Sequence, residues 1–385
     1  MTLFEHLELA DYQLPPQLTE NMLTPALTIH LPLVRHNINC LIQALSGDVS
    51  RWRPHLKTTK IPKIYQMLCL AGVRHFKCAT TREAHTLLQV LSDLKIDDAD
   101  LLIAHPLACS ELERLKQLAE EFPKTIVSVL CEDLETIDAL GPSIGVFIDV
   151  NSGMNRSGMP LEDEQTIFSI VRKSGDRFRG IHFYEGHIRN EEASTRRRLA
   201  FDGYARLVCL LNNLRDENLP CPEVLTSGTL SFLDAIAYGP FELLDGTNHR
   251  ISPGTVVFHD AQSQRALQNL DLRPAALLRT RAISQPTTDT ITTNAGSKSI
   301  AAEIGDPCCV ALEYPDLTAM HPSEEHLPFR THGEVPKRGE LLSLIPEHIC
   351  PTVNLAEEAV LIDENGSFSI AQVSARAHEI MLTKS

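Results

Sequence analysis

The chain has 385 residues and can bury a sizeable core, so we expect either one large barrel with an appended part or two to three ordinary domains. Apolar residues make up 43% of the chain and charged residues 22%, a composition typical of globular proteins that excludes the disordered and fibrous classes. Fifty acidic against 35 basic residues give a formal net charge of −15, which repels the phosphates of nucleic acid. We therefore expect no nucleic acid among the partners.

The sequence also argues against a membrane and against secretion. No stretch approaches the roughly 18 consecutive apolar residues of a membrane-spanning helix, and the first residues lack the basic and apolar segments of a signal peptide. The ten cysteines do not have the regular spacing of a disulfide framework, although Cys308 and Cys309 are adjacent. The sequence therefore predicts a cytoplasmic protein whose cysteines are mostly reduced and buried.

Short β-rich runs alternate with helical patterns from about residue 52 to residue 255. The helical patterns cover residues 62–70, 82–94, 111–122 and 163–173. Strands are predicted near 57, at 77–79, 100–104, 125–130, 144–150, 178–184 and 223–226, and at 249–252. Such alternation predicts a parallel sheet, and eight repeats favour a closed (β/α)₈ TIM-like barrel over an open doubly wound sheet.

The pattern changes after about residue 256 to short strand-like runs separated by Pro, Gly, Asp and Asn. These runs are 275–283, 290–293, 308–312, 341–345 and 359–362. Asn365-Gly366 lies between two apolar runs and is a strong hairpin signal. The fold class is therefore α/β, with a barrel domain over residues 36–255 and a mainly β second domain formed by residues 1–35 with 256–385.

Polar residues follow the predicted strands at the end where a barrel of this type holds its active site. They occur after the first, fifth, sixth, seventh and eighth strands, as Arg53-Pro54-His55-Leu56-Lys57, Gly153-Met154-Asn155-Arg156, Tyr184-Glu185-Gly186-His187, Ser227-Gly228-Thr229 and Pro253-Gly254-Thr255. Gly beside Ser or Thr offers backbone N–H groups and hydroxyls, which can hold a phosphate. The same residues also occur in ordinary turns, so the pattern alone leaves both interpretations open.

The β half contains a His-x-Cys pair, His348 and Cys350. On an extended segment, side chains two residues apart leave the same face, so an imidazole and a thiolate here can bind one metal ion. The alternative is a buried cysteine beside a surface histidine, because free cysteine is usually buried.

Seven motifs occur together in one order along the chain. They are Arg53-Pro54-His55-x-Lys57-Thr58-x-Lys60, Gly153-Met154-Asn155-Arg156-x-Gly158, Tyr184-x-Gly186-His187, Pro253-Gly254-Thr255, Gly296-Ser297-Lys298, Ser323-Glu324-Glu325-His326 and His348-x-Cys350-Pro351-Thr352-x-Asn354-Leu355. In this set the chain resembles the metal-activated D-serine dehydratase and D-threonine aldolase family, whose barrel is that of alanine racemase. The resemblance covers most of the chain, from about residue 24 to residue 355.

The resemblance implies pyridoxal 5'-phosphate as cofactor, with Lys57 as the lysine that forms the Schiff base. His55 shares the Lys57 motif and joins the cofactor-binding set. Arg156 is implied to face the phenolic oxygen of the cofactor, and Tyr184 to lie near its ring nitrogen. The residues implied to hold the phosphate are Ser227, Gly228, Thr229, Gly254 and Thr255.

The resemblance also implies a divalent metal at His348 and Cys350, with Glu325 and His326 as candidates to support its ligands. Family members with His-x-Asp at this place look like aldolases and suit Mn²⁺ or Mg²⁺. The thiolate of Cys350 prefers Zn²⁺, which as a Lewis acid assists the loss of hydroxide. Zn²⁺ is therefore the expected metal, with Mn²⁺ or Mg²⁺ as the alternative.

The expected function is a lyase that removes water and ammonia from a small β-hydroxy D-amino acid, such as D-serine or 3-hydroxy-D-aspartate. The alternative within the class is retro-aldol cleavage to glycine and an aldehyde. An amino-acid racemase, or a pyridoxal phosphate-binding protein without catalysis, fits less well, because neither needs the metal pair. By analogy with racemase-like enzymes we expect a homodimer.

The sequence departs from the family pattern at several positions. Thr59 stands where relatives usually have His, and Val256 stands where they commonly have Tyr. Ser227-Gly228-Thr229 replaces a run richer in glycine, and Asn151-Ser152 resembles a small insertion. These departures leave the cofactor assignment standing and put the substrate in doubt.

Overall fold

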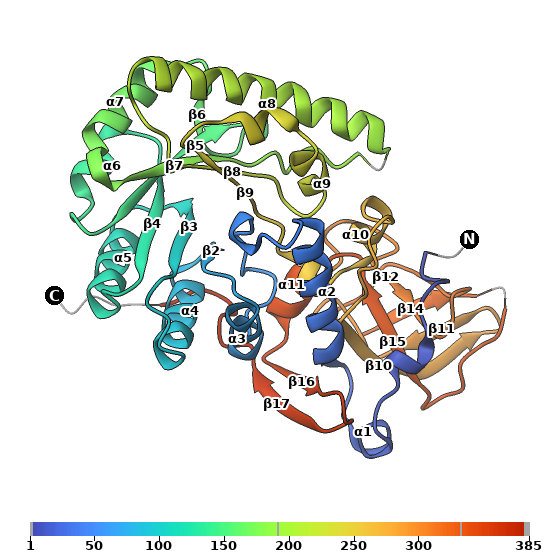
Figure 1. Cartoon of the computed structure of the whole chain (residues 1–385). Coiled ribbons are helices and arrows are strands. Elements are labelled where there is room, and N and C mark those ends of the chain that lie inside the picture. Colours follow the sequence, from blue (N-terminus) through green and yellow to red (C-terminus); the bar gives the residue numbers. More distant parts are fainter. Residues whose placement is uncertain (1–2, 191, 332, 381–385) are drawn as a thin grey trace. The chain divides into compact units, whose positions relative to one another are not determined.

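The structure, a computed structural model, describes residues 3–190, 192–331 and 333–380 (Figure 1). The chain forms two compact units, and neither is one continuous stretch. The parallel-sheet unit consists of Ile42–Lys57, Tyr65–Gly254 and Ala377–Ser385, and the β unit consists of Met1–Leu41, Thr58–Ile64 and Thr255–Arg376. Residues 36–41 and 58–64, which the sequence analysis places in the barrel domain, thus belong to the β unit.

The parallel-sheet unit alternates strands and helices, as predicted. Its strands are β2 (His75–Cys78), β3 (Asp100–Pro106), β4 (Ile126–Cys131), β5 (Gly145–Asn151), β6 (Met159–Pro160), β7 (Phe178–Phe183), β8 (Glu223–Thr226) and β9 (Asn248–Ile251). Its helices are α4 (Thr81–Asp93), α5 (Ser110–Glu121), α6 (Leu134–Ala139), α7 (Glu164–Ser174), α8 (Ala193–Asp216) and α9 (Phe232–Ile236), with 3₁₀ turns η2 (Val49–Arg51), η3 (Gly175–Arg177) and η4 (Gly239–Leu243). Helices α2 (Leu31–Ala44) and α3 (Pro62–Leu70) run across a boundary between the units.

Two parallel bridges close the sheet of this unit into a barrel. The strands pair in the order β2-β3-β4-β5-β7-β8-β9, with β6 beside β5. Trp52 then bridges Ile251 next to β9, and His55 bridges Lys77 in β2, so the segment 52–55 fills the eighth place. The predicted (β/α)₈ TIM-like barrel is confirmed.

The inside of the barrel follows the two-residue repeat of its strands. Leu102, Leu130, Phe147 and Leu225 come from four different strands and pack together as one buried cluster. Since alternate residues point to the same face, the residues two positions before and after each of them also face inward. Two residues earlier on these strands stand two carboxylates, Asp100 and Glu223, and two small residues, Ser128 and Gly145. Two residues later the inward positions approach the ends of the strands.

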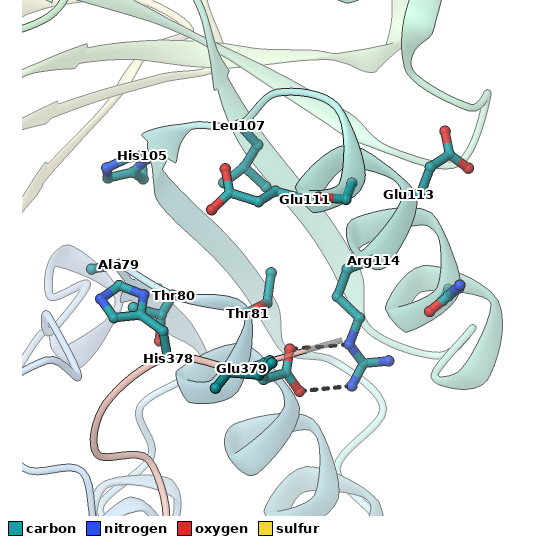
Figure 2. Close-up of a pocket in the computed structure, with 13 residues that line it drawn as sticks. Ala79, Thr80, Thr81, His105, Leu107, Glu111, Glu113, Arg114, His378 and Glu379 are labelled. Carbon is teal, nitrogen blue, oxygen red and sulfur yellow. Dashed lines mark hydrogen bonds and ion pairs between the residues drawn. The ribbon is translucent and has the colours of Figure 1, made fainter. Parts of the chain in front are cut away.

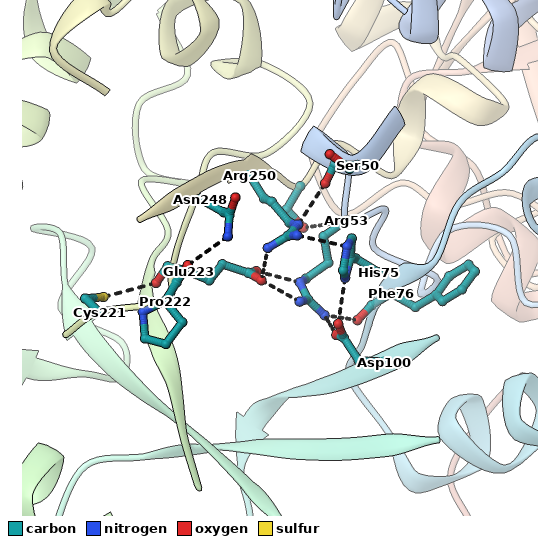
Figure 3. A network of polar contacts seen from close by, with 11 residues as sticks. Ser50, Arg53, His75, Phe76, Asp100, Cys221, Pro222, Glu223, Asn248 and Arg250 are labelled. Atoms are coloured by element: carbon teal, nitrogen blue, oxygen red, sulfur yellow. Dashed lines mark hydrogen bonds and ion pairs between the residues drawn. The ribbon is translucent and has the colours of Figure 1, made fainter. Parts of the chain in front are cut away.

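A buried ionic network lies at the start of the strands (Figure 3). Arg53 is fully buried and donates to both carboxylate oxygens of Glu223, each at 2.8 Å, and also to Asp100. His75 lies 2.6 Å from Asp100, and Arg250 donates to Glu223 and contacts His75 at 2.9 Å. The Arg53 guanidinium and the neighbouring His75 hold the pKa of Asp100 well below its usual range, although burial opposes this. The network therefore joins five segments of the barrel in one charge-balanced cluster.

The β unit contains the remaining strands, and its sheet closes on itself. The strands are β1 (Ala26–His30), β10 (Ala276–Thr287), β11 (Thr290–Thr293), β12 (Cys309–Ala311), β13 (Thr318–Ala319), β14 (Leu327–Arg330), β15 (Leu341–Pro346), β16 (Glu358–Ile362) and β17 (Phe368–Gln372). They pair in the order β11-β14-β13-β12-β15-β10-β1-β16-β17, and an additional pairing of β10 with β11 closes six of them into an antiparallel barrel. The mainly β second domain is thus confirmed.

The hairpin predicted at Asn365-Gly366 joins β16 and β17, which pair antiparallel, and Gly366 has a φ of +76°. Short helices and 3₁₀ turns complete the β unit: α1 (Pro16–Asn21), α10 (Ala261–Ala266), α11 (Ile349–Leu355), η1 (Leu9–Tyr12) and η5 (Thr255–Val257). Among the described residues, no helix combines the length and the apolar character needed to cross a bilayer.

We predict that Glu223→Gln destabilises the protein by about 3–5 kcal/mol, because it leaves Arg53 and Arg250 buried with less negative charge. Urea unfolding followed by circular dichroism measures the change. The matched control is Glu217→Gln, which removes a carboxylate paired with Arg172 at the surface, where both side chains are about half exposed, and costs at most about 1 kcal/mol. Equal effects of the two substitutions would contradict the structural importance of the network.

Candidate active site

Several residues predicted for the cofactor site lie where the parallel strands end. Lys57 is in the turn that follows segment 52–55, and it is partly buried. Tyr184 directly follows β7, Ser227 directly follows β8, and Gly254 lies three residues beyond β9. Since parallel strands of a barrel end at one rim, the fold gathers these residues at that rim.

The ring of Tyr184 is fixed by close packing and by two cations. A Cβ added to Gly186 would lie 2.3 Å from ring atoms of Tyr184, and one added to Gly228 would lie 2.9 Å from the ring. The Arg156 guanidinium carbon and the Lys77 ammonium each lie 5.5 Å from the ring centroid. Arg156 and Tyr184, which the resemblance implies for the phenolic oxygen and the ring nitrogen of one cofactor, therefore lie close together.

A buried histidine supports this arrangement from within the barrel. His182 Nδ1 lies 2.7 Å from Asp149 Oδ1, and Ser157 donates to the other oxygen of Asp149 at 2.8 Å. The imidazole of His182 stacks on Tyr184 with a centroid distance of 6.4 Å. The sequence analysis does not assign His182 a role, although its place two residues before Tyr184, which directly follows the same strand, is a signal for a shared face.

Glu185 is a second functional candidate that the sequence analysis does not place in the site. Its carboxylate is buried and accepts hydrogen bonds from Tyr204 at 2.5 Å, Ser231 at 2.7 Å and the Ser227 backbone N–H at 3.1 Å. Burial raises the pKa of Glu185. The carboxylate thus fixes the turn that begins at Ser227.

The turn after β8 has features expected of a phosphate site. Ser227 has a φ of +63°, and its hydroxyl oxygen is buried with no hydrogen-bond partner among the described residues. A Cβ added to Gly254 would lie 2.3 Å from the carbonyl oxygen of His55, so only glycine permits this approach of the two backbones. An unpaired buried hydroxyl next to glycine fits a ligand oxygen, and these residues therefore fit the implied cofactor.

The other predicted cofactor residues are placed less directly. Thr229 is partly buried in the turn after β8. Thr255 begins η5 in the β unit, where its hydroxyl lies 3.3 Å from Cys350 Sγ. The phosphate role of Thr229 and Thr255 therefore stays a prediction.

The predicted metal pair lies at the start of a helix in the β unit. The segment is not extended throughout, as the sequence analysis assumes, because His348 is the N-cap of α11 and Cys350 lies in its first turn. The two side chains nevertheless share a hydrogen bond. The Cys350 thiol also lies 3.1 Å from the hydroxyl of Thr58.

Two acidic residues accompany His348. Glu303 lies 2.5 Å from His348 Nδ1, and the fully buried Asp260 accepts from the backbone N–H of Ile349 at 3.1 Å. Burial opposes protonation of His348, but Cys350 and these acids raise the pKa of His348 to about 9. An incoming metal ion would therefore displace a proton. Glu325, a candidate to support the pair or to lie in a solvated turn, pairs with Lys298 at the surface.

The predicted metal ligands, His348 and Cys350, suit a soft metal ion, but they are only two. Imidazole nitrogen and thiolate sulfur are ligands typical of zinc. The described residues contain no group of three His, Cys, Asp or Glu side chains arranged to hold a metal ion. A metal held by His348 and Cys350 alone would keep several positions open for water or substrate, as a catalytic metal requires.

A separate cavity of about 370 Å³ lies beside the ends of β2 and β3 (Figure 2). Its lining includes Thr80, His105, Glu111 and His378. The C-terminal segment forms part of the lining, and Glu379 accepts hydrogen bonds from Arg114 Nε at 3.1 Å and Nη2 at 3.0 Å. This cavity contains none of the residues implied for the cofactor.

Comparison with protein families agrees with the fold. Residues 29–259 match the alanine racemase, N-terminal domain family, and residues 275–362 match a family described as "Putative serine dehydratase domain". The chain belongs to the alanine racemase N-terminal domain family. The predicted relationship to D-serine dehydratases and D-threonine aldolases is confirmed.

Individual relatives include enzymes with two different activities. The chain is 24% identical over 374 residues to D-threonine aldolase from Arthrobacter sp., with 92% of each chain covered. It is 27% identical over 247 residues to D-threo-3-hydroxyaspartate dehydratase from Delftia sp. (strain HT23), which covers 62% of this chain and 61% of the relative. The crystal structure of D-threonine aldolase from Filomicrobium marinum has the same fold, with a TM-score of 0.78, 24% identity and coverage of 92% and 95%.

We predict that Arg114→Leu loosens the C-terminal segment, because Glu379 then loses its paired guanidinium. Amide exchange of residues 377–380 should become about tenfold faster, which corresponds to about 1.4 kcal/mol for a partly buried charged hydrogen bond. The control is Lys116→Leu on the same helix, which removes a pair with Glu113 that is more exposed than the Arg114–Glu379 pair. Unchanged exchange in Arg114→Leu would show that other contacts hold the segment.

Proposed function

We propose that the protein is a pyridoxal phosphate- and metal-dependent lyase that removes water and ammonia from a small β-hydroxy D-amino acid. The observation that carries the proposal is the His348–Cys350 pair, which a racemase or a simple cofactor carrier does not need. The rim of the parallel-sheet unit supports it with Lys57, Arg156 and Tyr184. The named activities of the relatives, an aldolase and a dehydratase of hydroxy D-amino acids, agree with this class.

The cofactor residues divide the work of binding and proton transfer. When bound, pyridoxal phosphate supplies an electron sink for negative charge at the α-carbon. Arg156 and Tyr184 would hold the ring, and the backbone around Ser227, Gly228 and Gly254 would bind the phosphate. Lys57 would hold the cofactor through its amine, and its Nζ would take the α-proton.

In the proposed function, residues of the β unit hold the metal ion that acts on the β-hydroxyl of the substrate. His348 and Cys350 would hold Zn²⁺, which as a Lewis acid lowers the cost of releasing hydroxide. The buried Asp260 and the nearby Glu303 fix the position of His348. A soft thiolate favours zinc over Mn²⁺ or Mg²⁺, and this preference favours elimination over aldol cleavage.

Retro-aldol cleavage to glycine and an aldehyde is the second candidate, because D-threonine aldolase from Arthrobacter sp. aligns along 92% of the chain. The two reactions differ in the fate of the hydroxyl: elimination expels it, whereas cleavage removes its proton. The natural substrate, the homodimer and the cytoplasmic location stay predictions.

We predict that the purified protein binds pyridoxal phosphate with a visible absorption band, and that borohydride attaches the pyridoxyl label to Lys57. Lys57→Ala should abolish lyase activity and change the free energy of unfolding by no more than about 1 kcal/mol, because Lys57 lies in a turn. Peptide mass spectrometry locates the label. Lys63→Ala, at an exposed position, is the control. A label on Lys60 or Lys298 would overturn the assignment.

We also predict bound zinc, and keto acid plus ammonia as products from D-serine, D-threonine or a 3-hydroxy-D-aspartate, with activity lost on chelation. Cys350→Asp should weaken zinc binding at least about tenfold, because substitution of residues that only support a metal ligand already costs about that much. It should also lower the rate of elimination more than the rate of aldol cleavage. Metal analysis and product chromatography measure both. Cys209→Ser, at an exposed cysteine, is the control. Glycine plus aldehyde with Mn²⁺ dependence rejects elimination.

A further inference from the structure

Arg156 lies on an exposed loop that burial does not fix. The loop covers residues 152–158, between β5 and β6, and none of these residues is buried. Two of them have a left-handed backbone, Gly153 with a φ of +108° and Asn155 with a φ of +54°. Residues other than glycine rarely adopt this conformation, although asparagine does so more often than most. The proposed function needs Arg156 in one place beside Tyr184, so other contacts must hold the loop.

The side chain of Asn151 supplies three of these contacts. Asn151 is the last residue of β5 and pairs with Pro160 of β6. Its carboxamide oxygen accepts from the backbone N–H of Gly153 at 3.0 Å and from that of Asn155 at 3.1 Å. Its carboxamide nitrogen donates to the side-chain oxygen of Asn155 at 2.9 Å. One side chain thus binds both residues that have the left-handed backbone, and the second of them directly precedes Arg156.

A second residue of β5 holds the residue that follows Arg156. Ser157 donates to a carboxylate oxygen of Asp149 at 2.8 Å. Asp149 lies two positions before Asn151, and side chains two positions apart leave a strand on the same face. Arg156 therefore stands between two residues, Asn155 and Ser157, that are each bound to the end of β5.

The same loop is bound to the segment that carries Tyr184. The hydroxyl of Ser152 donates to the carbonyl oxygen of Tyr184 at 2.6 Å. The guanidinium carbon of Arg156 in turn lies 5.5 Å from the centre of the Tyr184 ring. Because hydrogen bonds and not buried side chains fix this loop, the loss of a few of them lets the guanidinium move away from the ring.

We propose that Asn151 is the residue that positions Arg156 for the cofactor ring. It acts through Asn155 and the loop backbone, which it holds in one conformation before a ligand arrives, so that binding does not have to order the loop. This role rests on the proposed function, because Arg156 needs a fixed place only where it faces a cofactor. Asn151 and Ser152, which depart from the family pattern, are thus residues whose side chains hold the loop.

Arginine NMR of the cofactor-free protein tests the position of Arg156. The side-chain signal of Arg156, identified by its absence in Arg156→Lys, should be shifted by the Tyr184 ring, and Tyr184→Leu gives its position without the ring. In Asn151→Ala the signal should move toward the Tyr184→Leu position. Asn213→Ala, which removes an asparagine hydrogen bond at the surface of α8, is the control and should leave the signal unchanged. A role of Asn151 in stability alone would leave the Arg156 signal of the folded protein unmoved.

Release of pyridoxal phosphate gives a second measurement. The cofactor should dissociate up to about tenfold faster from Asn151→Ala, which corresponds to about one net hydrogen bond. Asn151→Asp should stay close to wild type in both measurements. Its carboxylate still accepts from the two N–H groups, and the amide of Asn155 can rotate to donate to it.

The proposal is overturned if Asn151→Ala leaves the Arg156 signal where it is in the wild type, or if the cofactor leaves this variant at the wild-type rate. Where Asn151→Ala does not fold, Asn155→Ala takes its place, because it removes the other end of the same side-chain contact. An unmoved Arg156 signal in that variant contradicts the proposal. If the signal moves as expected but the wild type does not bind pyridoxal phosphate, the proposed function fails and the positioning of Arg156 by Asn151 stands.

Discussion

The burial of one arginine at the start of the first barrel segment is the constraint on which the parallel-sheet unit depends. Segment 52–55 has only two backbone bridges to its neighbours, at Trp52 and His55. Arg53 lies between them and joins Glu223 and Asp100 from two other strands. A buried guanidinium is tolerated only with full pairing, so the strands that supply the acids must hold their register. At segment 52–55 the backbone pairing is sparse. The paired charges of Arg53, Glu223 and Asp100 therefore help to close the barrel there.

The barrel has two regions of different charge. At the start of the strands, two arginines face two carboxylates in one closed network (Figure 3). At the rim, Lys57, Lys77 and Arg156 face carboxylates that are already engaged by neighbouring donors. Lys57 and Arg156 bring positive charge to the rim, which suits an anionic ligand, although the whole chain carries a net charge of −15. Local arrangement, and not composition, therefore decides what this end of the barrel attracts.

The sequence predicts the fold well, because the spacing of apolar residues along the chain shows which side chains a helix or strand buries. Helix α3 and strand β11 have the predicted bounds, and the hairpin at Gly366 lies where turn chemistry places it. The site is predicted only in part. Lys57 and Tyr184 are marked by their motifs, but Lys77 sits in a short strand whose pattern shows no sign of its charged surroundings. Those surroundings come from strands far apart in the chain, and no local pattern contains them.

The interleaving of the two units has a consequence for how such a protein can vary in evolution. The chain passes between the units at residues 41–42, 57–58, 64–65, 254–255 and 376–377. Neither unit is encoded by one uninterrupted stretch, so recombination cannot exchange one of them as a single cassette. One of the passages directly follows Lys57, and another directly follows Gly254. A single crossover in the gene therefore separates residues that fold together in one unit.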